Sequence, residues 1–546
     1  MSVFVDLIDT DFRGDIAEDR KTLDAFSRDA SLFSVSPSLV VFPRDVADLK
    51  TLVAGAVAAK KKGERVTLTA RAAGTDMSGG PLSEGVIVSF TKYFTRMRAG
   101  DGVATAEPGV YYRDFEKETL KRGYIMPSYP ASRELAAIGG IVANNSGGEK
   151  SLTYGKTERY VKQVKAVLAD GEEHVFEKIP LTEAWQKTHG GSFEASIYRG
   201  VLELIQNNRA MIEAARPKVS KNSAGYALWN VIDEKAQTCD LTKLFVGSQG
   251  TLGLISEVTF TLVHPYEHSR MLVMFLKDTA VLGELIPTVL EYKPESFESY
   301  DDHTFEIAVR YFTDIARRLK GTMLELALRF LPEFWKVLTN GVPKMVLIAE
   351  FTAVSDEEAE AKALSALHGI KRFNLPARIT RTQEESEKYW VIRRESFNLL
   401  RHHIHGKRTA PFIDDIVVSP NHLPAFLPKL EAILEQYDIT YTIAGHVGDG
   451  NFHIIPLMDL SKPEAVRVIQ ELSEKVYKLV LSYKGSITGE HNDGLIRTPY
   501  LKQMYGEEIV RLFEEIKNIF DPQGIFNPGK KVKGSLSYAI SHIQRS

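Results

Sequence analysis

The side chains best suited to chemistry lie close together near the C-terminus. Between residues 445 and 494 the chain reads Gly-His446-Val-Gly-Asp-Gly-Asn-Phe-His453 and later Gly-Glu490-His491-Asn492. Two imidazoles and a carboxylate suit a divalent transition metal with further positions left for substrate, and a histidine beside the carboxylate can act as a base. We therefore predict a metal site at His446, His453 and Glu490, with His491 as the base. The alternative is that these histidines are satisfied in loops, because no sequence rule fixes the distance between the two segments.

A tight turn has to bring the first two imidazoles together. The residues between His446 and His453 include Gly-Asp-Gly-Asn, a turn signal, and apolar runs flank it at 441–444 and 454–457. This pattern predicts a strand, a turn and a second strand, which would place both rings side by side.

The composition excludes several classes of protein. A chain of 546 residues is too long for a single core, so we expect two or more domains. Its formal net charge of −3 gives no general attraction to nucleic acid. The lone Cys239 excludes an intrachain disulfide, a four-cysteine zinc site and an iron–sulfur cluster ligated by this chain. The chain shows no signal-peptide pattern and no run of about 18 apolar residues, so we expect a cytoplasmic protein.

A first glycine-rich segment follows a predicted strand, helix and strand. Residues 39–43 predict a strand, Asp45 is a favourable N-cap for a helix through Lys62, and residues 65–70 predict the second strand. That strand leads into residues 71–80, whose three glycines and closely spaced N–H groups can form an anion-binding concavity.

Two further segments share this character. Residues 130–148 combine small and apolar side chains that let the main chain approach a flat ligand, and residues 245–256 contain three more glycines before a strand. Each segment alone is equally well explained by tight turns. Three together, all before residue 260, predict a nucleotide cofactor.

In this order and spacing the three segments resemble the PCMH-type flavin-binding domain of the vanillyl-alcohol oxidase family, whose members hold FAD between two α+β subdomains. The C-terminal His and Glu segments are similar to those of its D-2-hydroxyacid dehydrogenase branch, which includes D-lactate and D-2-hydroxyglutarate dehydrogenases and the glycolate oxidase flavoprotein subunit. The resemblance runs from about residue 36 to about residue 531. It implies an α+β fold with a two-subdomain PCMH-type FAD-binding domain and a cap domain, an antiparallel sheet covered by helices.

The implied domains are an N-terminal extension (1–35), the FAD-binding domain (36–267), the cap or substrate domain (268–485) and a C-terminal segment that returns to the flavin site (486–546). A helical insert at about 304–340 interleaves Arg and Lys with Phe and Trp. Such a surface could dock peripherally on the inner face of a membrane or on a partner, although helices that mix core aromatics with solvated charges are commoner.

The resemblance also implies which residues hold the cofactor. They are Arg71, Ala73, Gly74, Thr75, Asp76, Ser78, Gly79, Gly80, Pro130, Ser132, Ile138, Gly139, Gly140, Ala143, Asn144, Asn145, Ser146, Gly147, Gly148, Gly250, Ile255 and Asn527. Some relatives attach FAD through a His or Cys in these loops, and this chain has neither there, so we expect noncovalent FAD. The family often has Glu where this chain has Gln249, a change expected to tune affinity.

On the substrate side, Arg393 resembles the family's arginine that contacts the substrate carboxylate, with Arg394 as the alternative match. A nearby cluster of His402, His403 and His405 could bind metal, but a solvated basic loop explains it better. Ile413 and Ile455 stand about where the hydroxyglutarate enzymes have Lys and Asn. Both changes remove polar groups, which favours a small monocarboxylate.

The function implied is a dehydrogenase for a small D-2-hydroxy acid, with D-lactate favoured. His446, His453 and Glu490 would hold Zn or Mn, His491 would remove the hydroxyl proton, and Asn492 would orient His491 or the substrate. Electrons would leave to an external acceptor, an iron–sulfur subunit, a quinone or a cytochrome, and a homodimer is left open. The alternatives are a glycolate oxidase-type flavoprotein subunit of an electron-transfer complex, or an FAD enzyme like the alkylglycerone-phosphate synthases, which carry a run of His where this chain has Glu490 and His491.

Overall fold

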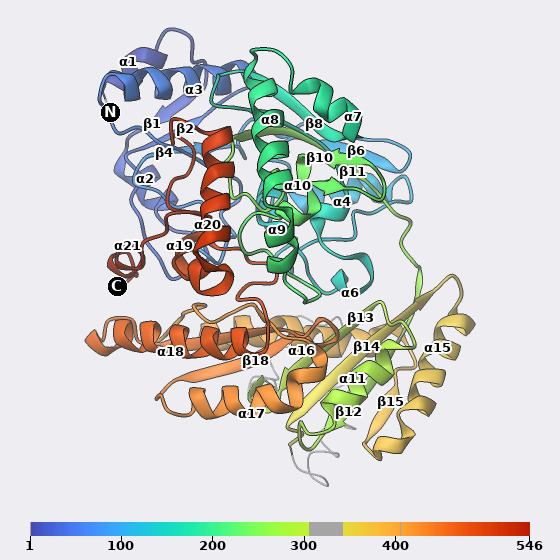
Figure 1. Cartoon of the computed structure of the whole chain (residues 1–546). Helices are drawn as coiled ribbons and strands as arrows, with labels where there is room; N and C mark the ends of the chain where they lie inside the picture. Colours follow the sequence, from blue (N-terminus) through green and yellow to red (C-terminus); the bar gives the residue numbers. More distant parts are fainter. Residues whose placement is uncertain (1, 305–341, 404–405, 546) are drawn as a thin grey trace.

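The computed structural model describes residues 2–304, 342–403 and 406–545, and the chain forms three sheets in sequence order. The first two sheets and their helices make one half of the molecule, called the flavin half because the predicted cofactor segments lie in it. The third sheet with its helices makes the other half, drawn below it in Figure 1. This arrangement confirms the predicted α+β fold, with two subdomains followed by an antiparallel sheet covered by helices.

The first sheet is mostly parallel and has four strands. Its order is β1 (Asp15–Ala17), β2 (Leu39–Phe42), β4 (Val86–Ser89) and β3 (Leu68–Arg71). Helix α3 (Val46–Lys61) connects β2 to β3, and the Asp45 carboxylate accepts hydrogen bonds from the N–H groups of Ala47 and Asp48. The predicted strand, helix and strand are thereby confirmed. Helices α1 (Ser2–Ile8) and α2 (Arg20–Phe26) precede β2.

The second sheet is antiparallel and has seven strands. Its order is β5 (Met97–Ala99), β6 (Val103–Ala106), β11 (Leu254–Thr261), β7 (Val161–Val167), β8 (Glu173–Pro180), β10 (Thr238–Asp240) and β9 (Ile232–Asp233). The helices between these strands are α4 (Tyr112–Leu120), α5 (Ile138–Asn144), α6 (Ser151–Tyr154), α7 (Leu181–Lys187), α8 (Phe193–Asn207), α9 (Arg209–Ala215) and α10 (Thr242–Phe245), with short 3-10 turns at η1 (Thr157–Arg159) and η2 (Leu228–Asn230). Its core also takes in buried side chains of α8 and of α20 (Leu501–Phe520), a helix from the C-terminal end of the chain.

The third sheet is antiparallel, with the order β15 (Ala377–Ile379), β12 (His268–Leu276), β14 (Met345–Ala353), β13 (Ser296–Asp301), β18 (Thr440–His446), β19 (Asn451–Met458) and β16 (Arg408–Thr409), while β17 (Ile416–Val417) also pairs with β19. The helices packed with it are α11 (Leu282–Leu290), α15 (Asp356–Gly369), α16 (Gln383–His403), α17 (Leu423–Leu434) and α18 (Pro463–Ser482), and the short turns are η3 (Lys371–Phe373) and η4 (Pro420–His422).

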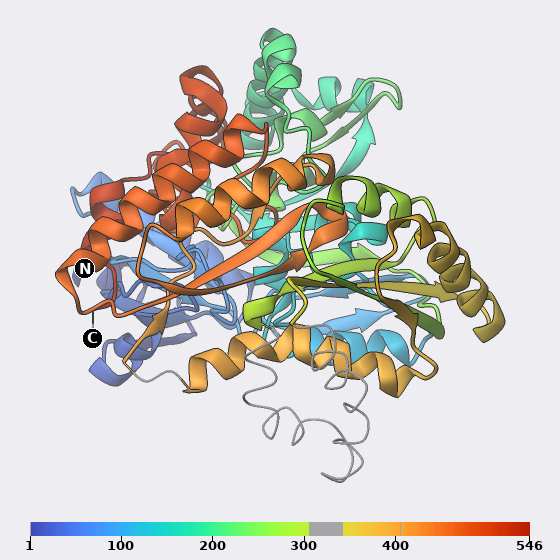
Figure 2. The same ribbon diagram turned by 90° about the horizontal axis from the view of Figure 1, so that it is seen from below.

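Alternating side chains give this sheet two different faces. Leu272 and Met274 on β12 pack with α11, α15, α17 and α18, whereas Met271 and Val273 on the same strand face Trp390 on α16. Figure 2 shows α16 on one side of the sheet, opposite α17 and α18. The α16 face is therefore the one that can carry a site between the sheet and this helix.

Charged side chains join the two halves. The Arg394 guanidinium on α16 donates to both carboxylate oxygens of Glu149 in the flavin half, at 2.7 and 2.9 Å. Lys150 lies 3.0 Å from Glu295, which also accepts a hydrogen bond from Tyr154. The last elements, α19 (Gly494–Arg497), η6 (Thr498–Tyr500), α20 and α21 (Leu536–Ser541), return to the flavin half (Figure 1).

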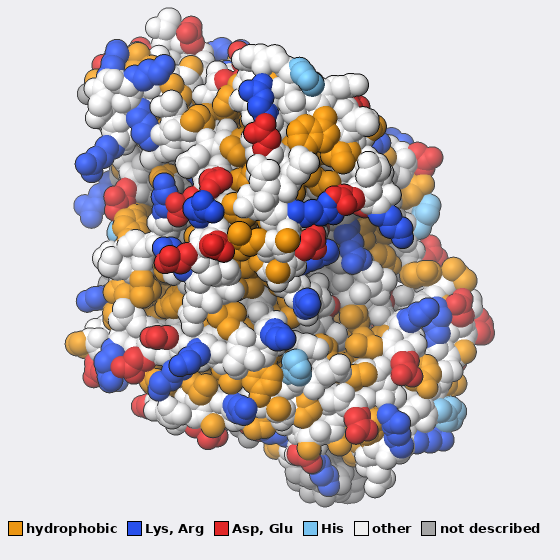
Figure 3. Space-filling model, in the orientation of Figure 1, with side chains coloured by type: hydrophobic (Ala, Val, Ile, Leu, Met, Phe, Trp, Pro, Cys, Tyr) orange, Lys and Arg blue, Asp and Glu red, His pale blue; other side chains and the backbone are white. Residues whose placement is uncertain are grey.

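The surface charges indicate no particular binding site. On the face drawn in Figure 3, acidic and basic side chains are interspersed. No helix in the described part of the chain combines the length and apolarity needed to span a bilayer. The predicted basic and aromatic insert lies outside the described residues apart from residue 304, and the side chains of the cluster at 402–405 also lie outside them.

Lys517 on α20 is a buried anchor for the C-terminal segment. Its ammonium pairs with Asp521 and donates to the carbonyls of Thr251 and Phe526. We predict that Lys517→Met destabilises the fold by about 3 kcal/mol, because removing one partner leaves a buried charge uncompensated. The measurement is the thermal unfolding midpoint. The exposed Lys502→Met, which loses only a surface pair with Glu507, should change it little, and equal shifts in both variants would contradict the prediction.

Candidate functional site

A β-hairpin positions the first two histidines. Strands β18 and β19 are joined by η5 (Val447–Asp449), and Gly450 takes a left-handed conformation with φ of 66°. A Cβ at that position would lie 1.7 Å from the Val418 carbonyl oxygen, so only glycine fits this turn. His446 ends β18, His453 lies on β19, and their ring centroids are 5.2 Å apart. The predicted strand, turn and strand are confirmed.

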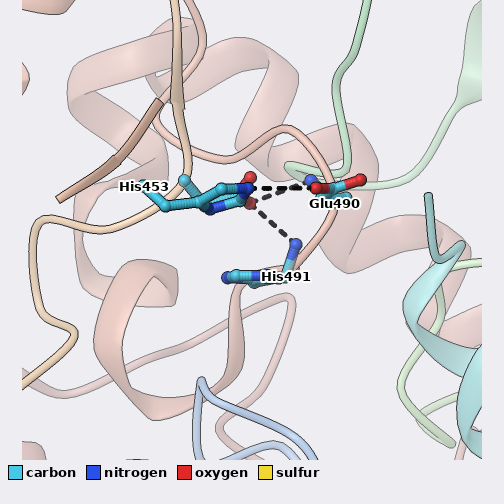
Figure 4. Close-up of side chains that lie close together, drawn as sticks. His453, Glu490 and His491 are labelled. Carbon is cyan, nitrogen blue, oxygen red and sulfur yellow. Dashed lines mark hydrogen bonds and ion pairs between the residues drawn. The ribbon is translucent and has the colours of Figure 1, made fainter. Parts of the chain in front are cut away.

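Glu490 brings both imidazoles to one point. Its Oε1 forms a hydrogen bond with Nε2 of His446 at 2.9 Å and lies 3.3 Å from Nε2 of His453. The ring of His491 stacks on that of His453, with centroids 5.0 Å apart, and Figure 4 shows His453 directed at Glu490 with His491 beside it. The structure thus brings together the predicted metal ligands and the predicted base.

Carboxylates hold the other nitrogen of each ring. Glu298 on β13 binds Nδ1 of His446 at 2.5 Å. Asp414 binds Nδ1 of His453 at 3.1 Å through one oxygen and Nδ1 of His491 at 2.6 Å through the other. A carboxylate at Nδ1 fixes the orientation of an imidazole and makes Nε2 the nitrogen available to a metal or to a proton from substrate.

Asp415 holds in place the backbone segment that carries Glu490 and His491. Its Oδ2 accepts hydrogen bonds from the backbone N–H groups of both residues, at 2.8 and 2.7 Å, and from the Thr488 hydroxyl. Because these donors come from the backbone, the position of the two side chains follows from the main chain rather than from their own rotamers alone.

The sequence interpretation did not find Glu298, Asp414 or Asp415, nor did it find Lys221, whose Nζ lies 3.6 Å from Oε2 of Glu490. The two aspartates carried a signal, since they stand adjacent inside the apolar run from Phe412 to Val418. Buried carboxylates without partners are costly, so such a pair within a buried stretch indicates a polar site. Glu298 and Lys221 gave no comparable pattern, because their partners lie far away in the sequence.

These contacts shift the pKa values of the site. Burial alone would raise the pKa of Glu490, but the Lys221 ammonium, followed by His446, holds it well below its usual range. Burial would lower the pKa of His453, yet Asp414 and then Glu490 outweigh it and raise the pKa to about 10. The pKa of His491 is also raised, since Asp414 and Asp415 outweigh its burial.

The donor set fits a divalent metal in two overlapping ways. The predicted set, His446, His453 and Glu490, converges through Glu490 Oε1. Ligand atoms of Asp415, His453, Glu490 and His491 also lie within 4.8 Å of one another. Asp415 is the weaker ligand of that second set, because its oxygens already accept four hydrogen bonds. Two imidazole nitrogens and a carboxylate oxygen with open positions match the donor chemistry of catalytic zinc.

The three glycine-rich segments meet, as a nucleotide site requires. Asp76 Oδ2 accepts from the N–H groups of Ser78 and Gly80, and its Oδ1 accepts from the side-chain amide of Asn144 on α5. Gln249 donates to the Ser78 hydroxyl, and Asn527 donates to the carbonyls of Gly80 and Gln249. Small residues, backbone groups and neutral side chains dominate this set, and such groups suit a nucleotide cofactor.

The remaining predicted cofactor residues fall into the same regions. Arg71 ends β3 and donates to the carbonyls of Phe26 and Arg28. The others lie as follows: Ala73, Gly74, Thr75 and Gly79 between β3 and β4; Pro130 and Ser132 between α4 and α5; Ile138, Gly139, Gly140 and Ala143 on α5; Asn145, Ser146 and Gly148 after it; Gly250 before β11; and Ile255 on β11.

Gly147 joins the cofactor segments to the histidine site. A Cβ at Gly147 would lie 2.5 Å from Oε2 of Glu490, so the main chain after α5 packs directly on the carboxylate. Asn492 lies in the same contact zone. It was predicted to orient His491 or substrate, but its amide donates to the carbonyls of Asn144 and Gly247, so it ties the C-terminal segment to the cofactor segments.

Arg393 and Arg394 point in different directions from α16. Nε of Arg393 donates to Glu298 Oε2 at 3.2 Å, so Glu298 links this arginine to His446. Arg394 is engaged with Glu149, which leaves Arg393 as the arginine beside the histidines. Ile455 lies two residues after His453 on β19, hence on the same face of the sheet. Ile413 is fully buried in the apolar cluster that includes α17 and α18, so the expectation that Ile413 shapes the substrate site is wrong.

Two family models match the chain. The model described as FAD binding domain matches residues 37–177, and the one described as FAD linked oxidases, C-terminal domain, matches residues 266–531.

Among curated proteins, the chain is 26% identical to a D-2-hydroxyglutarate dehydrogenase of Escherichia coli (strain K12), over 95% of this chain and 50% of that protein. It is 24% identical to glycolate oxidase subunit GlcD of Bacillus subtilis (strain 168), over 92% and 91%. It is 25% identical to a D-lactate dehydrogenase of Archaeoglobus fulgidus, over 85% of each protein. The chain spans about half the length of the first D-2-hydroxyglutarate dehydrogenases that it matches.

Solved structures share the fold. A 4-ethylphenol oxidase from Gulosibacter chungangensis aligns with a TM-score of 0.67 at 15% identity, covering 98% of this chain and 97% of that one. An alkyldihydroxyacetonephosphate synthase aligns with a TM-score of 0.66 at 14% identity, covering 97% and 84%. At these identities the likeness concerns the fold and not the reaction.

The raised pKa of His453 gives a pH-dependent stability. The folded, metal-free chain holds this proton more tightly than the unfolded chain, so its contribution is complete below pH 6.5 and is lost as the pH rises through about 10. We predict that the thermal midpoint of chelator-treated protein falls over this interval and that His453→Gln reduces the fall. His174→Gln, outside the site, is the control. A fall of equal size in His453→Gln and wild type would contradict the prediction.

Proposed function

Because the chain belongs to the FAD-linked oxidases with a PCMH-type flavin-binding domain, we propose that it is a dehydrogenase that oxidises a small D-2-hydroxy acid to the 2-oxo acid. The observation that carries the proposal is Glu490. Its Oε1 lies next to the Nε2 atoms of His446 and His453. Its Oε2 packs against Gly147 of a cofactor segment. An alcohol bound at the histidines would thus lie beside the flavin segments.

When bound, FAD supplies the acceptor for the hydride from the substrate's α-carbon. His446, His453 and Glu490 would hold a divalent ion, Zn or Mn, which supplies Lewis acidity toward the substrate hydroxyl. The remaining tasks, which are to bind the carboxylate, hold the hydroxyl and take its proton, fall to side chains of this chain.

His491 is the proposed base. Its Nδ1 is bound to Asp414, so Nε2 is the atom that takes the hydroxyl proton, and the Asp414 carboxylate stabilises the imidazolium that forms. In the metal-free chain the raised pKa of His491 favours the protonated ring. A nearby positive charge lowers a pKa, so we expect the basic form of His491 when the adjacent His453 and Glu490 carry a metal.

Arg393 is the proposed contact for the substrate carboxylate. Glu298 holds the Nε edge of its guanidinium, and a bidentate contact with a carboxylate would use the terminal nitrogens. Glu298 also holds His446, so one buried side chain would set the distance between the group that binds the carboxylate and the site that binds the hydroxyl.

The proposed substrate is a small monocarboxylate, with D-lactate favoured. Ile455 shares the sheet face of His453, and an apolar side chain there offers a second carboxylate no hydrogen bond. Relatives named for D-2-hydroxyglutarate and for D-lactate are similarly distant, so their names support the class of substrate rather than one member. The electrons would pass to an iron–sulfur subunit, a quinone or a cytochrome. The similarity to GlcD over most of both chains supports the alternative, a flavoprotein subunit of an electron-transfer complex.

Anaerobic titration of the flavin tests this function. We expect the yellow colour to bleach with one small D-2-hydroxy acid, foremost D-lactate, and not with the matching L-acid. D-2-hydroxyglutarate should bleach it more slowly, because Ile455, on the sheet face of His453, offers no partner to a second carboxylate. Bleaching by none of the acids would favour a synthase-like or partner-dependent protein over the proposed dehydrogenase.

The role of His491 is tested separately. We predict that His491→Gln lowers the rate constant of flavin reduction by ~10²–10⁴-fold, the usual contribution of a positioned base. Stopped-flow reduction at saturating substrate is the measurement, with the flavin spectrum as proof of cofactor binding. The control is His174→Gln, which breaks a comparable His–Asp pair with Asp170 away from the site. Reduction at the wild-type rate in His491→Gln would exclude the base role.

A further inference from the structure

Lys221 is a buried ammonium at the edge of the histidine site that the proposed mechanism does not use. It lies between α9 and η2 in the flavin half, and its side chain is 1% exposed. Its Nζ lies 3.1 Å from Oδ2 of Asp449 and 3.6 Å from Oε2 of Glu490. All three atoms are buried, and none of them has a hydrogen bond of good geometry within the described residues, so opposite charge dominates the contact.

Other buried lysines in the same half are held differently. Lys156, Lys517, Lys530 and Lys531 each donate to at least one backbone carbonyl. Such bonds tie segments of main chain together, which is a structural task. The Lys221 ammonium is instead directed at two carboxylates, one of which belongs to the predicted metal site.

The two oxygens of Glu490 have separate surroundings. Oε1 faces His446 and His453. Oε2 faces Lys221 on one side, and on another the backbone of Gly147, where even a Cβ would come within 2.5 Å. The carboxylate therefore presents a single oxygen to the histidines while its second oxygen is held on the flavin side.

The same segment also contacts the histidine hairpin. The Ser220 hydroxyl donates to the backbone carbonyl of Asp449 at 2.7 Å, and Lys221 pairs with the side chain of that residue. Asp449 lies in η5, three residues after His446. Residues 220 and 221 thus connect the flavin half both to the turn that carries His446 and to Glu490.

We propose that Lys221 is a positioning residue, whose ammonium retains Oε2 of Glu490 so that Glu490 binds the metal through Oε1 alone. The inference rests on the metal of the proposed function. Its consequence concerns the number of positions left for substrate. If both oxygens of Glu490 bound the ion, they would occupy a position that the hydroxyl or the carboxylate of the substrate needs, and catalytic sites depend on such open positions.

Loss of the ammonium should therefore impair substrate binding more than turnover. Without Lys221, Oε2 loses its attraction to the flavin side and can turn toward the ion. We expect KM for the hydroxy acid to rise by about tenfold, with a smaller change in kcat. Loss of an outer partner of a metal ligand typically costs ~10–100-fold in metal affinity or activity. Lys221→Arg keeps the charge and should recover most of the wild-type KM.

The test is the visible spectrum of the Co²⁺-loaded holoenzyme, in which the intensity of the ligand-field bands falls as the number of ligands rises. The flavin is fully reduced first, so that its absorption does not cover these bands. We expect weaker bands in Lys221→Met than in wild type, and bands close to wild type in Lys221→Arg.

The double variant Lys221→Met with Asp449→Asn leaves no unpaired carboxylate at position 449, and it replaces the single variant if that variant does not fold. Lys165→Met, which removes a lysine from a charge pair with Glu257 on the second sheet, is the control and should leave spectrum and KM unchanged.

Different experimental results would contradict the proposed function and the Lys221 inference. Wild-type protein that oxidises its substrate without binding Co²⁺ or Zn²⁺ would remove the metal from the proposed function, and the role of Lys221 with it. Wild-type protein that binds the metal, with bands and KM unaltered in the Lys221 variants, would overturn the Lys221 inference alone and leave the proposed function intact.

Discussion

Buried negative charge is the constraint on which the site depends. Five carboxylates meet with little access to water: Glu298, Asp414, Asp415, Asp449 and Glu490. Removing one partner of a buried charge pair costs about 3–5 kcal/mol, a large part of the ~5–15 kcal/mol that keeps a typical domain folded. Each carboxylate therefore needs a donor or a cation beside it. The donors are the imidazoles, Arg393 and the backbone N–H groups of residues 490 and 491, and Lys221 supplies the cation beside Asp449 and Glu490. Meeting that requirement also orients the catalytic groups.

The partners come from separate parts of the fold. Glu298 lies on a central strand of the third sheet, His446 and His453 lie on the adjacent hairpin, and Lys221 comes from the flavin half. Such a network forms only when the strands pair in the correct register and the flavin half is docked on them. A one-residue slip of either strand would turn His453 or Glu298 to the opposite face of the sheet. The site therefore takes up its geometry only when the two halves are docked together.

The sequence predicted the local features and missed the long-range ones. The hairpin, helix α3 and the three glycine-rich segments could be predicted because turn residues, an N-cap and small residues act within a few positions. Asp414 and Glu298 could not be assigned roles, since their partners lie 39 and 148 residues away. Asn492 shows the same limit. Its neighbour His491 suggested a catalytic role, whereas its amide contacts segments more than 240 residues earlier.

Asp414 explains how one carboxylate can serve both metal binding and proton transfer. Its two oxygens are bound to His453 and His491, so the protonation of the two rings is coupled. In the metal-free chain both rings are drawn toward the charged form by the same negative charge. A ligated His453 must be neutral at Nε2, and the proton it gives up is one that Asp414 had been stabilising. The Asp414 charge is then available to the other ring, where it stabilises the imidazolium formed when His491 takes the substrate's proton. The pairing that makes these histidines poor bases without metal is therefore the pairing that supports His491 as a base once the metal is bound.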